Sequence, residues 1–188
     1  MFIKTIKNSN VKGYLKLEID TGMGCEWLLL SEGQYDMLGR PLPCDEISDD
    51  DFRAARDGDE YNRAKKKALN VLAFGDNSER ELKLKLSRAN ISRICAETVV
   101  EEMKRLGYID EERQLTRLIE TEAKSKLHGP KKILQRLAAK GYSSEKIKST
   151  MRRLEIEKII DFEEIKKKLL ATATSPDEKK KVLYKNGF

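Results

Sequence analysis

The side chains that most often do chemistry in proteins are few in this sequence. Its 188 residues include a single histidine, His128, and three cysteines, Cys25, Cys44 and Cys95. One histidine excludes a catalytic histidine dyad and a multi-histidine metal site, and the cysteines lack the CxxC spacing of a metal or redox motif. No Gly-rich phosphate-binding loop of the Walker or dinucleotide type is present. We therefore predict no catalytic residues, no metal site and no cofactor.

Two runs of carboxylates, 49–51 and 110–112, are the other candidates for chemistry. Each run stands where a helix is expected to begin, and negative charge is favourable at that end of the helix macrodipole. His128 precedes Gly129 and Pro130 at a helix end, where a capping role is expected. We interpret all of these residues as structural.

The remaining polar groups of interest are basic. Residues 1–60 hold 7 Lys/Arg against 13 Asp/Glu, a net charge of −6, whereas residues 61–188 hold 31 against 19, a net charge of +12. This surplus suits an anionic partner, such as a nucleic acid, a protein–nucleic acid filament or an acidic protein face. A solvated helix surface rich in lysine would have the same composition. The candidate partner-binding residues are Arg80, Lys83, Lys85, Arg88, Lys131, Lys132, Arg136 and Lys140.

The segments that carry these cations repeat at a spacing of 51 residues. Leu82 recurs as Ile133, and Ser92 recurs as Ser143. A fixed period of about this length marks stacked units that bury their apolar faces against one another. Stacking is expected to align the cations of successive units into a stripe suited to a long polyanion or a filament groove. No aromatic residue is interleaved with them, so base stacking is not predicted.

The repeat predicts a mainly α fold: tandem three-helix repeats in an elongated curved array, with a small N-terminal β-containing lobe. Extended segments are expected over 2–7, 12–20 and 26–31, with a hairpin loop over 21–24. A short helix from Ser48 to Arg56 should follow, broken by Asp57-Gly58-Asp59. The predicted organisation is the lobe over 1–58, repeat 1 over 59–109, repeat 2 over 110–160 and an incomplete repeat 3 over 161–188. Tyr108, Tyr142 and Phe188 follow helix ends and are expected to pack between helices.

Several broad classes are excluded by the same sequence. No apolar run approaches the roughly 20 residues of a membrane span, and the N-terminus lacks the apolar region of a signal peptide. An odd number of scattered thiols fits a reducing compartment. We predict a cytoplasmic monomer without a membrane partner.

Four motifs occur in an order that resembles the RecX family, the bacterial regulators of the RecA recombinase. They are Ser-x-x-Glu-Leu from Ser78, Gly-Tyr-Ile-Asp from Gly107, Gly-Pro-x-x-Ile-x-x-x-Leu-x-x-Lys-Gly from Gly129, and the final Gly-Phe. The resemblance covers about residues 61–188. This sequence departs from the family pattern in having Gly-Asp-Asn over 75–77 where many members place Arg, in having Glu111 for a second Asp, and in an early end to the third unit.

The resemblance implies a regulator that binds along the groove of the RecA–single-stranded DNA filament and bridges neighbouring protomers. It also implies impaired filament growth, ATP hydrolysis, strand exchange and coprotease activity, and hence a place in DNA repair, homologous recombination and the SOS response. Weak direct contact with DNA is a further possibility. The alternative is a helical nucleic-acid-binding regulator that acts independently of RecA. The sequence leaves the direction and strength of regulation open.

Overall fold

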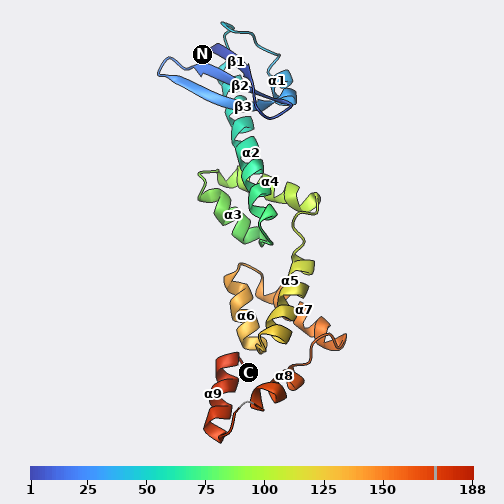
Figure 1. Cartoon of the computed structure of the whole chain (residues 1–188). Coiled ribbons are helices and arrows are strands. Elements are labelled where there is room, and N and C mark those ends of the chain that lie inside the picture. The colour runs from blue at the N-terminus through green and yellow to red at the C-terminus, as the bar shows by residue number, and fades with distance from the viewer. Residues whose placement is uncertain (172) are drawn as a thin grey trace. The chain divides into compact units, whose positions relative to one another are not determined.

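The computed structural model describes residues 1–171 and 173–188, and over these residues the chain is mainly helical with a three-stranded sheet near its N-terminus (Figure 1). The chain divides into two compact units. The first comprises Met1–Ala73 and Lys85–Glu102, and the second comprises Phe74–Leu84 and Met103–Phe188. The predicted fold class, mainly α with a β-containing N-terminal lobe, is confirmed.

The sheet lies where alternating and β-forming residues predict it. Its strands are β1 (Phe2–Asn8), β2 (Tyr14–Asp20) and β3 (Cys25–Ser31), antiparallel in the order β1-β2-β3. The predicted hairpin loop is confirmed, since the Thr21 amide donates to the Gly24 carbonyl at 3.0 Å. One face of the sheet buries a core of residues from the strands and the segments after them: Ile3, Leu17, Ile19, Leu28, Leu30, Tyr35, Ile47 and Ala55.

A short helix after β3 has no counterpart in the sequence prediction. Helix α1 (Glu32–Met37) begins with a capping box. The Gln34 amide donates to the Ser31 hydroxyl at 3.3 Å, and the Ser31 amide donates to Gln34 Oε1 at 2.8 Å. The local signal was present in the sequence, because a Ser followed three residues later by Gln is a helix start.

Helix α2 (Asp49–Ala73) is continuous, so the break predicted at Asp57-Gly58-Asp59 is wrong. Tertiary contacts outweigh the local breaker signal here. Asp59 Oδ1 accepts the Leu29 amide at 2.9 Å, and Asn62 Nδ2 donates to the Leu29 carbonyl at 2.8 Å. These bonds satisfy polar groups on the edge of β3, which would otherwise be open to pairing with another strand. A methyl group at Gly58 would lie 3.1 Å from Leu30, so glycine permits this close approach.

Among the described residues, the predicted bounds of repeat 2, 110–160, contain three helical segments, and those of repeat 3, 161–188, contain two. The Arg113 amide donates to Asp110 Oδ1 at 3.0 Å, which confirms the helix start expected there, and the Glu178 amide donates to the Ser175 hydroxyl at 3.2 Å. The predicted repeat boundary after residue 58 lies inside α2, whereas those after 109 and 160 lie between helices. These helices are α3 (Glu79–Ser87), α4 (Arg93–Arg105), α5 (Glu111–Glu120) continued by the π-helix η1 (Thr121–Ser125), α6 (Pro130–Ala139), α7 (Ser144–Ile156), α8 (Phe162–Leu170) and α9 (Pro176–Asn186).

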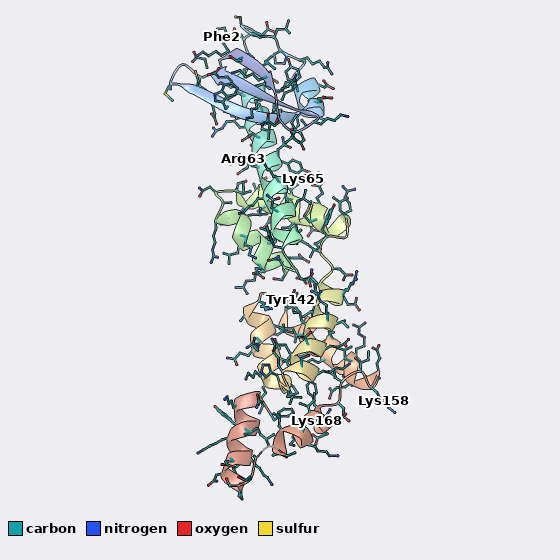
Figure 2. The ribbon with its side chains drawn as sticks, in the orientation of Figure 1. Phe2, Arg63, Lys65, Tyr142, Lys158 and Lys168 are labelled. Carbon is teal, nitrogen blue, oxygen red and sulfur yellow. The ribbon has the colours of Figure 1, made fainter. Side chains whose placement is uncertain are left out.

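The second unit has its own core, built from the inward faces of α5 to α8. Tyr142, labelled in Figure 2, is buried there, and its hydroxyl donates to Gln114 Oε1 at 2.8 Å. Burial, with smaller contributions from nearby carboxylates, raises the pKa of Tyr142 to about 12, so it remains a neutral donor. The rings of Phe162 and Phe188 meet edge to face at 6.4 Å. The packing role predicted for Tyr142 and Phe188 is confirmed, but Tyr108 is 55% exposed and the same prediction is wrong for it.

Candidate partner-binding surface

Helix α6 carries most of the second group of predicted contact residues, and the structure gives them different surroundings. Lys131 is exposed, and no ion pair of its ammonium occurs among the described residues. Lys132 Nζ donates to a carbonyl oxygen at the end of α9, 3.0 Å away. Arg136 Nε lies 2.9 Å from Glu122 Oε2. Lys131 is therefore available to a partner, whereas Lys132 and Arg136 also serve internal contacts.

Lys140 lies apart from this group. It follows the last residue of α6 and is exposed. It is nine residues from Lys131, which at 100° per residue places it about half a turn away around the helix axis. Lys131 and Lys140 therefore lie on different sides of α6.

Helix α3 and the turn after it carry the other four predicted residues. Arg80 and Lys83 belong to the second unit, and Lys85 and Arg88 belong to the first. Arg80 and Arg88 are exposed, and the two lysines are half-buried. Arg80 occupies the position equivalent to Lys131 one period earlier, and its guanidinium group likewise has no carboxylate partner among residues 1–171 and 173–188.

The end of α6 and the start of α3 are joined by one serine. The Ser78 hydroxyl accepts the Glu81 amide at 3.1 Å and donates to the Lys140 carbonyl at 2.8 Å. It therefore satisfies a free amide at the start of one helix and a free carbonyl at the end of another. Gly141 follows, with φ of +93°, and a methyl group there would lie 2.7 Å from Ser78 Oγ and 3.1 Å from Arg80 Cβ.

The end of α9 meets the start of α6 in the same way. The Gly129 amide donates to the Asn186 carbonyl at 2.6 Å, and the Lys131 amide donates to the Gly187 carbonyl at 3.2 Å. Gly187 has φ of +83°, and a methyl group on it would lie 2.4 Å from the Lys132 amide nitrogen. The middle helices of successive repeats thus join end to end, and their macrodipoles meet with opposite partial charges in contact.

This joining gathers cations that the sequence spreads over about 100 residues. We call four cations at the two junctions the basic column, namely the exposed Arg80, Lys131 and Lys185 and the half-buried Lys132. A hollow of about 310 Å³ at the α6–α9 junction is lined by three of them and by Tyr184, which is 87% exposed. The fold thus brings Tyr184 beside cations of α6, although no aromatic is interleaved with the predicted contact residues in the sequence. Lys185 and Tyr184 were missed, although the end of α9 repeats that of α6 at an offset of 46 residues.

Beneath α6 lies a buried carboxylate held by three basic side chains. Glu122 is 4% exposed. Its Oε1 lies 2.6 Å from Lys126 Nζ, and its Oε2 lies 2.6 Å from His128 Nδ1 and 2.9 Å from Arg136 Nε. The His128 amide also donates to the Glu122 carbonyl at 3.0 Å, closing the helix end as predicted. His128 is therefore engaged in structure.

The charge balance of this cluster sets the acidity of Glu122. Burial alone would raise the pKa of Glu122, but hydrogen bonds from Lys126 and His128 and the charge of Arg136 together outweigh it, so the pKa is lowered from its ordinary 4.5. The charged form is thus favoured by folding.

We expect Glu122→Gln to reveal this preference through pH. Because the folded-state pKa is depressed, the stabilisation is present above the ordinary glutamate value and is lost as pH falls through the lower, folded one. The stability of the native protein should exceed that of the variant near pH 7, and the difference should shrink below about pH 4.5. Urea unfolding of both proteins along a pH series measures this difference. A difference that is constant with pH would contradict it.

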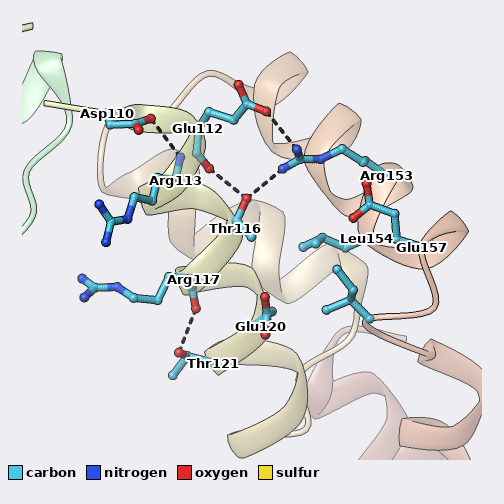
Figure 3. A pocket seen from close by; sticks show the side chains of 11 residues that line it. Asp110, Glu112, Arg113, Thr116, Arg117, Glu120, Thr121, Arg153, Leu154 and Glu157 are labelled. Atoms are coloured by element: carbon cyan, nitrogen blue, oxygen red, sulfur yellow. Dashed lines mark hydrogen bonds and ion pairs between the residues drawn. The ribbon is translucent and has the colours of Figure 1, made fainter. Parts of the chain in front are cut away.

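A groove of about 560 Å³ runs between α5 and α7 (Figure 3). Arg153 reaches across it, with one guanidinium nitrogen 2.9 Å from Glu112 Oε1 and another 2.8 Å from Thr116 Oγ1. The lining also contains Arg113 and Arg117. Its carboxylates, Asp110, Glu112, Glu120 and Glu157, outnumber its three arginines. These opposite charges leave the groove without the cationic surplus of the basic column.

The described residues were also compared with the requirements of a metal site and of a membrane-spanning helix. No group of three or more His, Cys, Asp or Glu side chains in 1–171 and 173–188 is placed to hold a metal ion. Over the same residues, no helix combines the length and apolar character needed to cross a membrane.

No family model matches the chain. Among curated proteins, it is 28% identical over 138 residues to the regulatory protein RecX of Clostridioides difficile, covering 72% of this chain. It is 34% identical over 107 residues to that of Salmonella newport and 33% identical to that of Escherichia fergusonii, each covering 52% of this chain. The matches span 64% of the length of each of these three relatives.

Solved structures share the fold. A crystal structure of a regulatory protein RecX matches with a TM-score of 0.71 at 20% identity, over 100% of this chain and 94% of that one. The RecX crystal structure from Lactobacillus salivarius matches with a TM-score of 0.50 at 17% identity, over 68% of this chain and 96% of that one. The sequence similarity and the shared fold together confirm the predicted resemblance to the RecX family.

Proposed function

We propose that this chain is a non-catalytic modulator of the RecA recombinase that binds along the groove of the RecA–single-stranded DNA filament, with inhibition as the expected direction. The similarity to regulatory proteins named RecX supports the regulatory role. The basic column is the observation that carries the choice of partner. Arg80 and Lys131 are equivalent exposed cations one repeat apart, and such a repeated charge suits a partner that itself repeats.

The proposed mechanism needs no reacting group. A protein that binds several protomers of a filament more tightly in one conformation than in another shifts the filament toward the favoured state. ATP turnover, strand exchange and coprotease activity would then fall together, because each depends on the filament changing or growing. Arg80 and Lys131 are proposed as contacts with acidic filament surface or DNA phosphates.

The test is RecA ATP hydrolysis on single-stranded DNA with increasing amounts of the chain. We expect hydrolysis to fall, and the double variant Arg80→Glu/Lys131→Glu to require about tenfold more protein for the same effect, the equivalent of about 1.4 kcal/mol. The matched control is Lys148→Glu/Arg152→Glu, which reverses two exposed charges on α7, away from the basic column. Unchanged hydrolysis at saturating protein would overturn the proposal.

The alternative, direct regulation through nucleic acid, is favoured by the same unpaired cations. It predicts tight binding to DNA in the absence of RecA. Affinity should then fall steeply with salt, because each neutralised phosphate releases condensed counterions. Weak binding to DNA alone, together with tight binding to RecA filaments, would favour the first proposal.

A further inference from the structure

The outer face of the N-terminal sheet carries an aromatic and basic cluster within an acidic lobe. Trp27, the only tryptophan of the chain, is 45% exposed on β3. Lys7 Nζ lies 5.1 Å from the centre of its ring. Lys7, Lys16, Trp27 and Leu29 line a shallow hollow of about 430 Å³ together with Leu28 and Asp59. The repeats and the basic column account for none of these residues.

The arrangement of the two lysines is unfavourable for folding alone. Lys7 and Lys16 are direct partners across β1 and β2, and like charges placed opposite each other destabilise a sheet. Both are exposed, and neither has a carboxylate partner among the described residues. A bound anion would relieve this repulsion.

The carboxylates nearby do not neutralise this pair. Asp59 accepts the Leu29 amide and pairs with Arg63 at 2.7 Å, so its charge is already matched. Glu18, the cross-strand partner of Trp27, adds one negative charge beside the two positive charges of Lys7 and Lys16. The surplus charge beside the tryptophan ring is therefore positive, although residues 1–60 as a whole are acidic.

We propose that this face binds single-stranded nucleic acid, with one base stacked on Trp27 and the adjoining phosphates held by Lys7 and Lys16. An exposed aromatic ring beside unpaired cations is the combination that single-strand binding uses. Stacking on a side chain requires an unstacked base, which a duplex does not offer. The incoming base would displace Lys7 from the ring face and leave its ammonium for a phosphate.

Because Trp27 is the sole tryptophan, its fluorescence reports on this site and on no other. We expect a short oligothymidylate, titrated into the whole chain at low salt without any filament protein, to quench this fluorescence to saturation. The double variant Lys7→Ala/Lys16→Ala should bind about tenfold more weakly by the same readout. Lys12→Ala, an exposed lysine in the turn before β2, is the matched control and should behave like the native chain.

A second measurement addresses the ring itself. By anisotropy of a labelled oligothymidylate, Trp27→Ala should lose about tenfold in affinity while Trp27→Phe retains most of it. Two results would overturn the proposal. One is saturation by anisotropy with unchanged Trp27 fluorescence, which places the nucleic acid elsewhere. The other is equal quenching by polyglutamate of the same charge, which points to an acidic protein partner.

Discussion

Replacing Arg136 by glutamate should lower the free energy of unfolding by about 2–4 kcal/mol. Removing one partner of a buried ion pair typically costs about 3–5 kcal/mol, and the reversal adds a second carboxylate beside Glu122. The half-exposed Arg136 side chain, at 46%, reduces this figure because water screens part of the interaction. Lys126 and His128 remain in contact with Glu122 and limit the loss. Urea unfolding followed by circular dichroism measures the effect.

The control for this prediction lies on the same helix. Lys131→Glu makes the same change of charge at an exposed position without an ion pair among the described residues, and surface changes of this kind usually stay within about 0.5 kcal/mol. Equal losses from both variants would show that general charge on α6, and not the contact with Glu122, controls stability. The comparison also guides functional work, because a loss of partner binding in an Arg136 variant would mix unfolding with lost contact.

The contact between Arg136 and Glu122 could not be predicted from local sequence. Glu122 follows α5 in a π-helix, where an acidic residue ordinarily faces water, and its burial depends on the packing of α6 against that segment. The pattern around Arg136 showed only a basic residue on an exposed helix face. A side chain that is partly exposed to water and also pairs with a buried carboxylate has no distinctive pattern in the local sequence.

Helix positions, in contrast, were largely predictable because their start and stop signals are local. The caps at Asp110 and Ser175 and the left-handed glycine at 187 all lie where the sequence indicates. Gly58 is the instructive exception. Its breaker signal is the same as at other helix ends, but the polar groups of β3 pair with the neighbouring Asp59 and Asn62 and hold the helix together.

The repeat predicted that equivalent residues would recur but not how they would meet. Ser78 and Lys140 are 62 residues apart and join α3 to α6 through one hydroxyl. The two glycines at the junctions, Gly141 and Gly187, each follow the end of a helix with a positive φ. Their second role, close approach to the next helix, depends on a neighbour that is distant in the sequence.

The close approach of Gly141 to the start of α3 predicts a large loss of stability for Gly141→Ala. An alanine at φ of +93° costs about 1–2 kcal/mol from the left-handed backbone alone. Its methyl group would also lie 2.7 Å from Ser78 Oγ and 3.1 Å from Arg80 Cβ, and overpacking of this kind typically costs about 1–3 kcal/mol. We expect a total loss of about 2–5 kcal/mol by urea unfolding, with the junction between α6 and α3 as the part disturbed.

Gly107→Ala separates the two contributions. Gly107 also ends a helix, with φ of +76°, but a methyl group there meets nothing within 4 Å. Its replacement should therefore cost only the backbone term, about 1–2 kcal/mol. The excess loss at Gly141 measures the tightness of the end-to-end junction. Equal losses at both glycines would mean that the neighbouring helix yields freely, and the middle helices would then be joined too loosely to hold Arg80 and Lys131 at a fixed spacing for a partner.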